Sequence, residues 1–483
     1  PALDPEGLGL TDAMMRRIPS KLLRIYVPGE NLAESLPYLR DVYTGTMAYE
    51  SEHISSHRQR TWLRERIEGS VYRKPLSPDR QRALLQRLLA VDALERFMHK
   101  AYLGQQQFSI EGLDMTVPMI DEAVELAAGA GAREVVIGMA HRGRLNVLAH
   151  NLGRPYETIF GEFEGTSTVQ VVKAVTEIPQ GGTGDVKYHH GYKRDFTLRE
   201  GASVLVKLES NPSHLESVDP VVIGATRAAQ TNRSGPVAER NPNLAMPVIL
   251  HGDAALPGQG VVAETFNLQA LDGYKVGGTL HLIQNNQVGF TTDIEDARST
   301  HWASDLAKGF DVPIIHVNAD DVEACISAVD LAMAFRAEFG HDVLIDLIGY
   351  RRFGHNEADE PAYTQPEMYA AIKHHDRACT LYAEKLITAG VVTRDEVERW
   401  QQQVWDKLSG EHQELKERIK EAAALDNLEQ VTGEYLLDRT KSPKFDTKVS
   451  DESLRLLSEQ LLTVPEGFDT HGKLQRQLDR RRV

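Results

Sequence analysis

The stretch that decides the fold runs from 251 to 292 and reads HGDAALPGQGVVAETFNLQALDGYKVGGTLHLIQNNQVGFTT. Asp253 follows the apolar run 247–250, and Asn286 follows a second apolar run, 279–283. Short apolar runs that end in polar turns are typical of buried strands. Because the carboxyl ends of parallel strands meet at one edge of a sheet, we expect the carboxylate and the amide to lie close together.

These two residues carry ligand types that suit one hard cation. Asp253, the side-chain oxygen of Asn286 and the carbonyl oxygen of Val288 would give Mg²⁺ three of its six oxygens, the rest coming from phosphate and water. A diphosphate could meet backbone N–H groups where 258–260 (GQG) leads into a helix-like segment. Taken alone, the pair is as compatible with structural roles, a turn at Asp253 and a helix cap at Asn286, as it is with a metal site.

The rest of the chain predicts an α/β fold in which helices flank a parallel sheet. Apolar runs alternate with helix-like segments from about 106 to 370, which indicates βαβ units. The predicted strands are 134–139, 203–208, 247–250, 279–283, 313–317 and 343–348, and 322–339 is a predicted helix. We expect a helical region over 1–105, the α/β domain over 106–370, and a helical region with a linker over 371–483. A helix is expected to begin at Ser77.

Polar motifs follow four of these runs in turn. His141 comes after the first, Asn211 to His214 after the second, Asp253 after the third and Asn286 after the fourth. The sequence therefore predicts one site at one edge of the sheet.

Composition argues against several classes of protein. The net charge of −16 disfavours nucleic acid or an anionic membrane as the main partner. The basic stretch 58–66 is interleaved with acids and reads as a solvated helix face. Two cysteines, Cys325 and Cys379, fit a reducing compartment. With no long apolar run or signal peptide at Pro1, we expect the cytoplasm of a bacterium or the mitochondrial matrix of a eukaryote.

Seven motifs together resemble the E1 component of 2-oxoglutarate dehydrogenase, and they occur in that family's order. They are GMAHRGRLNVLAH (138–150), GTGDVKYHHGY (182–192), NPSHLESVDPVVIG (211–224), HGDAALPGQGVV (251–262), NNQVGFTT (285–292), HVNADD (316–321) and YRRFGHNEADEPAYTQP (350–366). The wider thiamine diphosphate signature usually has glycine at the position of Ala254, whereas alanine is usual there in the 2-oxoglutarate branch.

This resemblance implies a thiamine diphosphate and Mg²⁺ enzyme that oxidatively decarboxylates 2-oxoglutarate in the tricarboxylic acid cycle. The succinyl group would pass to the lipoyl group of an E2 dihydrolipoyl succinyltransferase, which works with an E3, and the E1 would be a homodimer. The resemblance stops at Val483, before a pyrimidine-binding half would begin, so we expect part of an enzyme. No glutamate of this chain can be assigned to activating the cofactor ring.

The resemblance also assigns residues. Arg142 would anchor cofactor and substrate, since its forked donors suit phosphate and carboxylate. His141 and His189 would line the substrate pocket, where they could bind the distal carboxylate, stabilise an oxyanion or pass protons. Ser213 would offer its hydroxyl to the substrate or the cofactor. The remaining cofactor contacts would be Leu215 against a ring and the small Ala254 and Ala255 beside the diphosphate.

Three alternatives stay open at this point. The chain could be a 2-oxoadipate E1 of the same family. Its substrate has one methylene more than 2-oxoglutarate, and an enzyme pocket discriminates one methylene by only about 1–3 kcal/mol. A non-catalytic cofactor-binding or assembly module would keep the same fold. The segment 355–361 (HNEADEP) is expected to form a loop at the edge of the active site and is disfavoured as a second metal site.

Overall fold

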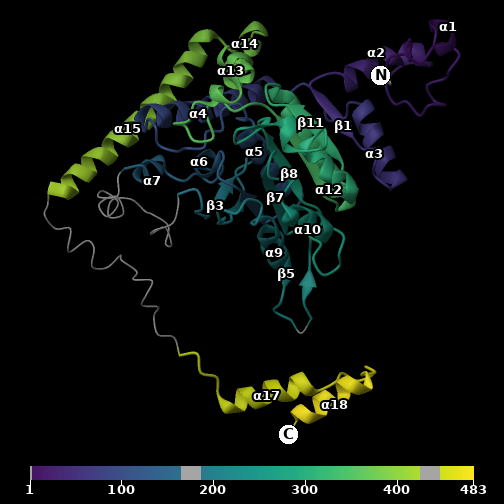
Figure 1. Cartoon of the computed structure of the whole chain (residues 1–483), viewed down its shortest axis with the longest axis vertical. Helices are drawn as coiled ribbons and strands as arrows, with labels where there is room; N and C mark the ends of the chain where they lie inside the picture. The colour runs from purple at the N-terminus through teal and green to yellow at the C-terminus, as the bar shows by residue number, and fades with distance from the viewer. Residues whose placement is uncertain (1–2, 165–186, 236, 425–445, 483) are drawn as a thin grey trace. The chain divides into compact units, whose positions relative to one another are not determined.

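The computed structural model describes residues 3–164, 187–235, 237–424 and 446–482, and the chain forms two compact units, Pro1–Asp426 and Asn427–Val483. Figure 1 shows the elements coloured along the chain. Residues 182–186 of the second motif lie outside the described residues, as do 425–445 of the predicted C-terminal region.

An eight-stranded sheet forms the centre of the first unit. Its order is β1 (Met47–Glu50), β11 (Ile314–Asn318), β12 (Val343–Ile348), β8 (Leu280–Asn285), β7 (Ala245–Gly252), β2 (Glu134–Met139), β4 (Ser203–Leu208) and β3 (Tyr192–Thr197). The six inner strands are parallel, whereas β1 and β3 are antiparallel to their neighbours at the two edges. The predicted parallel α/β sheet is confirmed.

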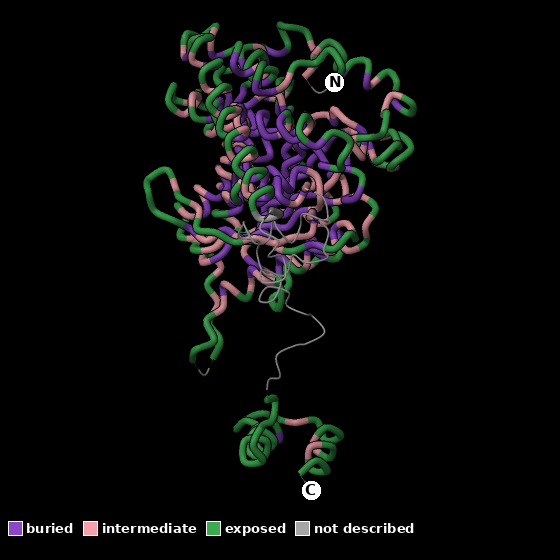
Figure 2. Tube along the Cα trace, turned by 90° about the vertical axis from the view of Figure 1, so that its left-hand side faces the viewer, coloured by how far each residue is buried: buried purple, intermediate pink, exposed green. Residues whose placement is uncertain are grey.

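Helices cover both faces of this sheet. Val135 and Ile137 of β2 belong to a core cluster with α5 (Thr116–Gly129) and α12 (Val322–Phe339), whereas Val136 packs with α9 (Asp219–Ala229). Figure 2 shows the buried core between these layers. The first unit's other helices are α1 (Asp12–Met15), α2 (Leu32–Tyr43), α3 (His57–Glu68), α4 (Pro78–Ala101), α6 (Arg144–Asn146), α7 (Tyr156–Gly161), α10 (Gly260–Leu268), α11 (Ile294–Ala297), α13 (Pro366–Lys373), α14 (Ala378–Thr388) and α15 (Arg394–Ala424).

Short helical turns and strand pairs complete the first unit. They are the π-helix Val147–Asn151, the 3₁₀ helices Ala303–Phe310 and Pro361–Tyr363, and the pairs β5 (Thr231–Asn232) with β6 (Glu239–Arg240) and β9 (Val288–Gly289) with β10 (Thr292–Asp293).

The local start signals act as expected. The Ser77 hydroxyl accepts the N–H of Arg80 and caps α4, and Thr393 and Glu396 exchange side-chain and backbone hydrogen bonds at the start of α15. The stretch predicted to be helical before residue 105 also supplies strand β1, which pairs with β11.

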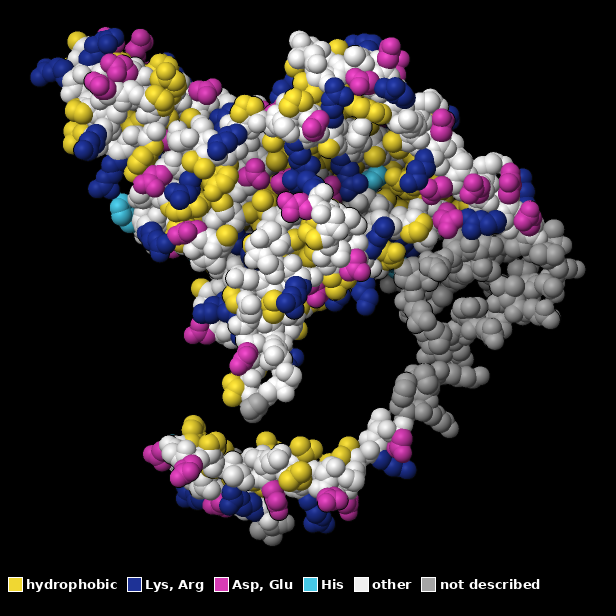
Figure 3. Space-filling view, turned by 180° about the vertical axis from the view of Figure 1, so that it is seen from behind, with side chains coloured by type: hydrophobic (Ala, Val, Ile, Leu, Met, Phe, Trp, Pro, Cys, Tyr) yellow, Lys and Arg dark blue, Asp and Glu magenta, His cyan; other side chains and the backbone are white. Residues whose placement is uncertain are grey.

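The second unit contains α17 (Asp451–Leu462) and α18 (Gly472–Arg481). Hydrophobic side chains gather on α17, among them the exposed Leu454, Leu457 and Leu461 (Figure 3). No helix in the described parts of the chain is long and apolar enough to cross a membrane.

A buried polar network connects edge strand β1 to the inner sheet. His316 lies 2.9 Å from Asp346 through Nδ1 and 2.8 Å from Glu50 through Nε2, and Asp346 accepts a hydrogen bond from the side chain of Asn285. Asn285 directly precedes Asn286. The network therefore fixes the strand end from which the predicted metal ligand extends.

The stability of the first unit should fall at alkaline pH through His316. Burial alone would lower the pKa of His316, but its hydrogen bonds to Asp346 and Glu50 raise it to about 9. Stabilisation by the charged imidazole is fully present below about pH 6.5 and is lost as the pH rises through about 9. We expect His316→Asn to remove on the order of 2 kcal/mol at pH 6.5 and little at pH 10, measured by denaturant unfolding. The exposed His301 offers a control substitution, and an unchanged pH slope in His316→Asn would contradict this assignment.

Candidate functional site

A cavity of about 500 Å³ lies at the carboxyl edge of the inner strands. The four strands whose ends carry the predicted motifs are direct neighbours, in the order β8, β7, β2, β4. Eight of the ten predicted site residues line the cavity: His141, Arg142, Leu215, Asp253, Ala254, Ala255, Asn286 and Val288. The sheet order therefore brings together residues that are more than 140 positions apart in the sequence.

The predicted metal ligands lie together at the end of β7 and β8. The backbone N–H of Asn286 donates to Asp253 Oδ1 at 3.4 Å, and the N–H of Val288 donates to Asn286 Oδ1 at 3.3 Å. All three residues are buried. Burial raises the pKa of Asp253 to about 7, so its ionised form lacks sufficient compensation in the protein alone. A divalent cation would offset this cost, and the donor set therefore fits Mg²⁺.

Close packing of two backbone segments requires small residues beside Asp253. A Cβ at Gly289 would lie only 2.8 Å from the Cβ of Ala254, so the two backbones lie closer together than a side chain on both residues would allow. Ala254 is exposed to the cavity, whereas Ala255 is buried at its edge. The floor of the cavity beside the predicted metal ligands is therefore backbone and methyl groups, which leaves room for a diphosphate.

His141 and Arg142 enter the cavity on a tight turn after β2. The next residue, Gly143, has φ +71°, and a Cβ there would meet the side chain of Ile110 at 2.4 Å, so the turn requires glycine. Arg142 donates to the carbonyl of Ser109 at 2.8 Å, and the His141 ring packs 4.1 Å from the ring of Phe108. Burial and then Arg142 lower the pKa of His141 to about 3, so the imidazole is neutral at neutral pH.

Two further residues that line the cavity, Arg351 and His355, follow the end of β12. Neither was among the predicted site residues, although His355 begins the segment expected at the edge of the site. Arg351 donates to the carbonyl of Phe290, and His355 packs against Phe290 and His141 with ring centroids 4.9 and 5.5 Å apart. Burial, and then Arg142 and Arg351, lower the pKa of His355 to about 4. The signal was present, because the motif 350–366 follows a predicted strand at the same edge of the sheet.

The same motif is attached to the loop that carries Phe108. Glu357 accepts the backbone N–H groups of Gln107 and Ser109 at 2.7 and 3.0 Å. This carboxylate therefore fixes the segment 355–361 against the loop that carries Phe108.

His189 and Ser213 lie outside the lining of the cavity but contact each other. Ser213 Oγ and His189 Nε2 are 3.0 Å apart. Nearby, Arg144 donates to the carbonyls of Met139, His190 and Glu209. Its guanidinium thus holds the segment before β3 against the end of β2.

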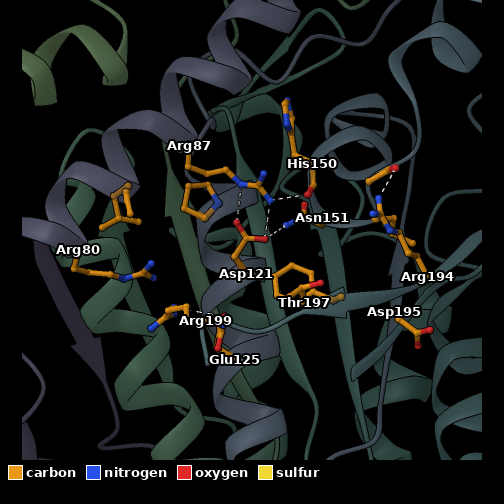
Figure 4. A pocket seen from close by; sticks show the side chains of 16 residues that line it. Arg80, Arg87, Asp121, Glu125, His150, Asn151, Arg194, Asp195, Thr197 and Arg199 are labelled. Atoms are coloured by element: carbon orange, nitrogen blue, oxygen red, sulfur yellow. Dashed lines mark hydrogen bonds and ion pairs between the residues drawn. The ribbon is translucent and has the colours of Figure 1, made fainter. Parts of the chain in front are cut away.

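A second cavity, of about 400 Å³, is lined by α4, α5 and β3 (Figure 4). Its arginines are already bound within the protein: Arg87 forms a forked ion pair with Asp121 at 2.7 and 2.9 Å, and Arg194 donates to the carbonyl of Gly153 at 2.6 Å. Arg80 and Arg199 both pair with Glu122. Carboxylates thus pair with Arg80, Arg87 and Arg199 in this cavity, whereas among the described residues no carboxylate forms an ion pair with Arg142 or Arg351 of the first cavity.

Comparison with known proteins identifies the family. Residues 111–424 match the family model described as dehydrogenase E1 component. The 2-oxoglutarate dehydrogenase E1 components of Bacillus licheniformis, Bacillus mycoides and Bacillus subtilis are 45%, 48% and 44% identical to this chain, each over 98% of it. The chain spans about half the length of these curated relatives (50%, 49% and 50%). The chain therefore belongs to the dehydrogenase E1 component family.

Proposed function

We propose that the first cavity binds thiamine diphosphate with Mg²⁺. The observation that carries this proposal is that one cavity is lined by two kinds of group. Oxygen ligands from Asp253, Asn286 and Val288 and the guanidinium groups of Arg142 and Arg351 line the same cavity. Burial and then Arg351 lower the pKa of Arg142 to about 10, so the two guanidinium groups repel each other. A magnesium-bound diphosphate and an acidic substrate would satisfy both kinds of group.

The protein's own groups would bind, orient and exclude water. Bound thiamine diphosphate supplies the electron sink that lets a 2-oxo acid lose CO₂. Leu215 would pack against a ring of the cofactor, with Ala254 and Ala255 beside the diphosphate. His141 and His355, neutral at neutral pH, can each donate and accept a hydrogen bond without adding charge.

The whole protein would be the E1 that oxidatively decarboxylates 2-oxoglutarate and passes the succinyl group to a lipoyl-bearing E2, working with E3. Its relatives are bacterial, which favours the cytoplasm, and we expect a homodimer. The similarity to 2-oxoglutarate dehydrogenase E1 components supports this reading. The test is decarboxylation of 2-oxoglutarate by the full-length protein with Mg²⁺ and thiamine diphosphate, with 2-oxoadipate as the competing substrate. Preference for 2-oxoadipate, or no turnover of either acid, would overturn it.

His189 should act on the substrate and not on the cofactor, because it contacts Ser213 outside the cofactor cavity. We expect His189→Ala to raise the KM for 2-oxoglutarate or lower kcat by roughly 3- to 10-fold, the value of one lost hydrogen bond. Thiamine diphosphate affinity, measured by calorimetry, should stay unchanged. Ser213→Ala should act in the same direction. Wild-type kinetics for both variants would remove the pair from the site.

A further inference from the structure

Four buried titratable side chains form a continuous chain that begins at the cofactor cavity. Glu216 Oε2 lies 2.7 Å from His251 Nδ1, His251 Nε2 lies 2.9 Å from His281 Nδ1, and His281 Nε2 lies 3.3 Å from Asp342 Oδ2. Each of the four is at most 5% exposed. Glu216 and His251 line the cavity, whereas Asp342 precedes β12 at the amino edge of the sheet.

The far end of this chain is fixed by the sheet itself. Asp342 Oδ1 accepts the backbone N–H of Thr279 at 2.7 Å, directly before β8. His281 lies in β8 and pairs with Ile249 of β7. The carboxylate of Glu216 is therefore tied, through two imidazole rings, to three neighbouring strands.

Glu216 needs such a tether because its backbone is strained. Its φ is +67°, a left-handed conformation that costs a residue with a side chain on the order of 1–3 kcal/mol. Such a conformation persists only where the surroundings hold it. The preceding residue, Leu215, lines the cavity beside Glu216 and is the apolar side chain of this turn.

A metal ion is a less suitable explanation for the same residues. Glu216, Asp219 and His251 lie close enough together to be considered as ligands. Two ligands of a tetrahedral Zn²⁺ stand about 3.4 Å apart, however, given bonds of about 2.1 Å. The 2.7 Å between Glu216 and His251 is instead a normal hydrogen-bond distance, and the other ring nitrogen of His251 faces His281.

We propose that Glu216 is a positioning residue, which the His251–His281–Asp342 chain holds in place so that Leu215 stays turned into the cavity against the ring portion of the cofactor. This inference rests on the proposed binding of thiamine diphosphate. Without the tether, residue 216 relaxes to negative φ and carries Leu215 away. The oxygen ligands at Asp253 and Asn286 lie on other strand ends and keep their positions. The diphosphate contacts and the ring contacts can therefore be separated by experiment.

The experiment measures, by calorimetry, how the full-length protein binds two probes in saturating Mg²⁺. Thiamine diphosphate reports the rings together with the diphosphate, and inorganic pyrophosphate reports the diphosphate site alone. Glu216→Ala should weaken thiamine diphosphate about 10-fold, equivalent to about 1.4 kcal/mol, and change pyrophosphate less than about twofold.

Two further variants separate the tether from the strain. Glu216→Gln keeps an oxygen for the Nδ1–H of His251 and should bind thiamine diphosphate within about twofold of wild type. Glu216→Gly loses the tether but adopts positive φ freely, and should fall between Gln and Ala. Glu122→Ala is the control, since Glu122 is also 5% exposed and lies in neither probe's site. Should Glu216→Ala not fold, Glu216→Gly carries the same comparison.

The outcomes separate failure of the proposed cofactor binding from failure of the positioning role of Glu216. Failure of wild-type protein to bind either probe would overturn the proposed function itself. If wild-type protein binds both probes and Glu216→Ala weakens both equally, or weakens neither, only the positioning role is overturned. Selective weakening of thiamine diphosphate that Glu216→Gln restores is the expected result, because a general loss of stability would affect both probes.

Discussion

Replacing Asp253 with alanine is expected to abolish the Mg²⁺-dependent binding of thiamine diphosphate to the full-length protein. Asp253 is the charged member of the predicted ligand set, and removing one partner of a buried charge pair costs about 3–5 kcal/mol. The dissociation constant should therefore rise by at least about 100-fold. Calorimetry at saturating Mg²⁺ measures it, and inorganic pyrophosphate should lose affinity in parallel.

The isosteric Asp253→Asn variant separates lost binding from lost structure. Burial raises the pKa of Asp253 to about 7, above the ordinary 3.8, so the folded state holds a proton that the unfolded state releases between about pH 4 and 7. Ionisation of Asp253 thus opposes folding of the cofactor-free protein as the pH rises. We therefore expect Asp253→Asn to unfold no more readily than wild type at pH 8. As a control, Asp121→Ala in the second cavity should bind thiamine diphosphate with normal affinity. Unchanged cofactor affinity in Asp253→Asn would remove the metal assignment.

Arg142→Gln is expected to lower kcat/KM for 2-oxoglutarate by about 100-fold. A guanidinium presents two parallel donors to a phosphate or carboxylate, and each hydrogen bond to a charged group contributes about 1.5–3 kcal/mol. Arg142 is partly buried in the lining of the cavity and donates one N–H to the carbonyl of Ser109, so its remaining donors are available to a ligand. Steady-state kinetics with saturating cofactor give the ratio, and calorimetry shows how much of the loss is cofactor binding.

Lysine should not restore Arg142, because a single ammonium cannot bind Ser109 and a forked anion at the same time. Arg87→Gln is a matched control, since Arg87 lies in the second cavity and pairs with Asp121. Full activity of Arg142→Gln would show that the anionic ligand is bound by other residues, such as Arg351 in the lining of the same cavity.

The inner sheet was predictable because its strands carry continuous or alternating apolar residues. β2 and β12 are buried along almost their whole length, whereas β4 alternates between buried and partly exposed residues. All three have the limits expected from their apolar runs, and so does α12. The edge strands were not predicted. β1 (MAYE) is only four residues long and pairs with β11, which is distant in sequence. β3 (YKRDFT) carries few apolar residues and becomes a strand through pairing with its sequence neighbour β4.

The site was predictable to the extent that its residues follow strands. Asp253, Asn286 and His141 each end an apolar run, and the sheet order brings them into one cavity. Phe108 comes from a loop before α5, with φ +53°, and no local pattern connects it to His141. The contact of His189 with Ser213 likewise depends on packing between β3 and the turn after β4, which spacing along the sequence does not determine. The catalytic and binding roles of all these residues remain predictions.

The strand order has a consequence for how the polypeptide can be assembled on the ribosome. Met47 of β1 pairs with Val317 of β11, so β1 must wait until 270 more residues have been synthesised before its neighbour is present. The inner strands β4 and β7 both pair with β2 and follow it more closely in sequence, so these three strands can meet earlier. Pairings of such long sequence separation are slow and leave an edge exposed meanwhile. The nascent chain must therefore keep its N-terminal segment from aggregating until most of the first unit has emerged.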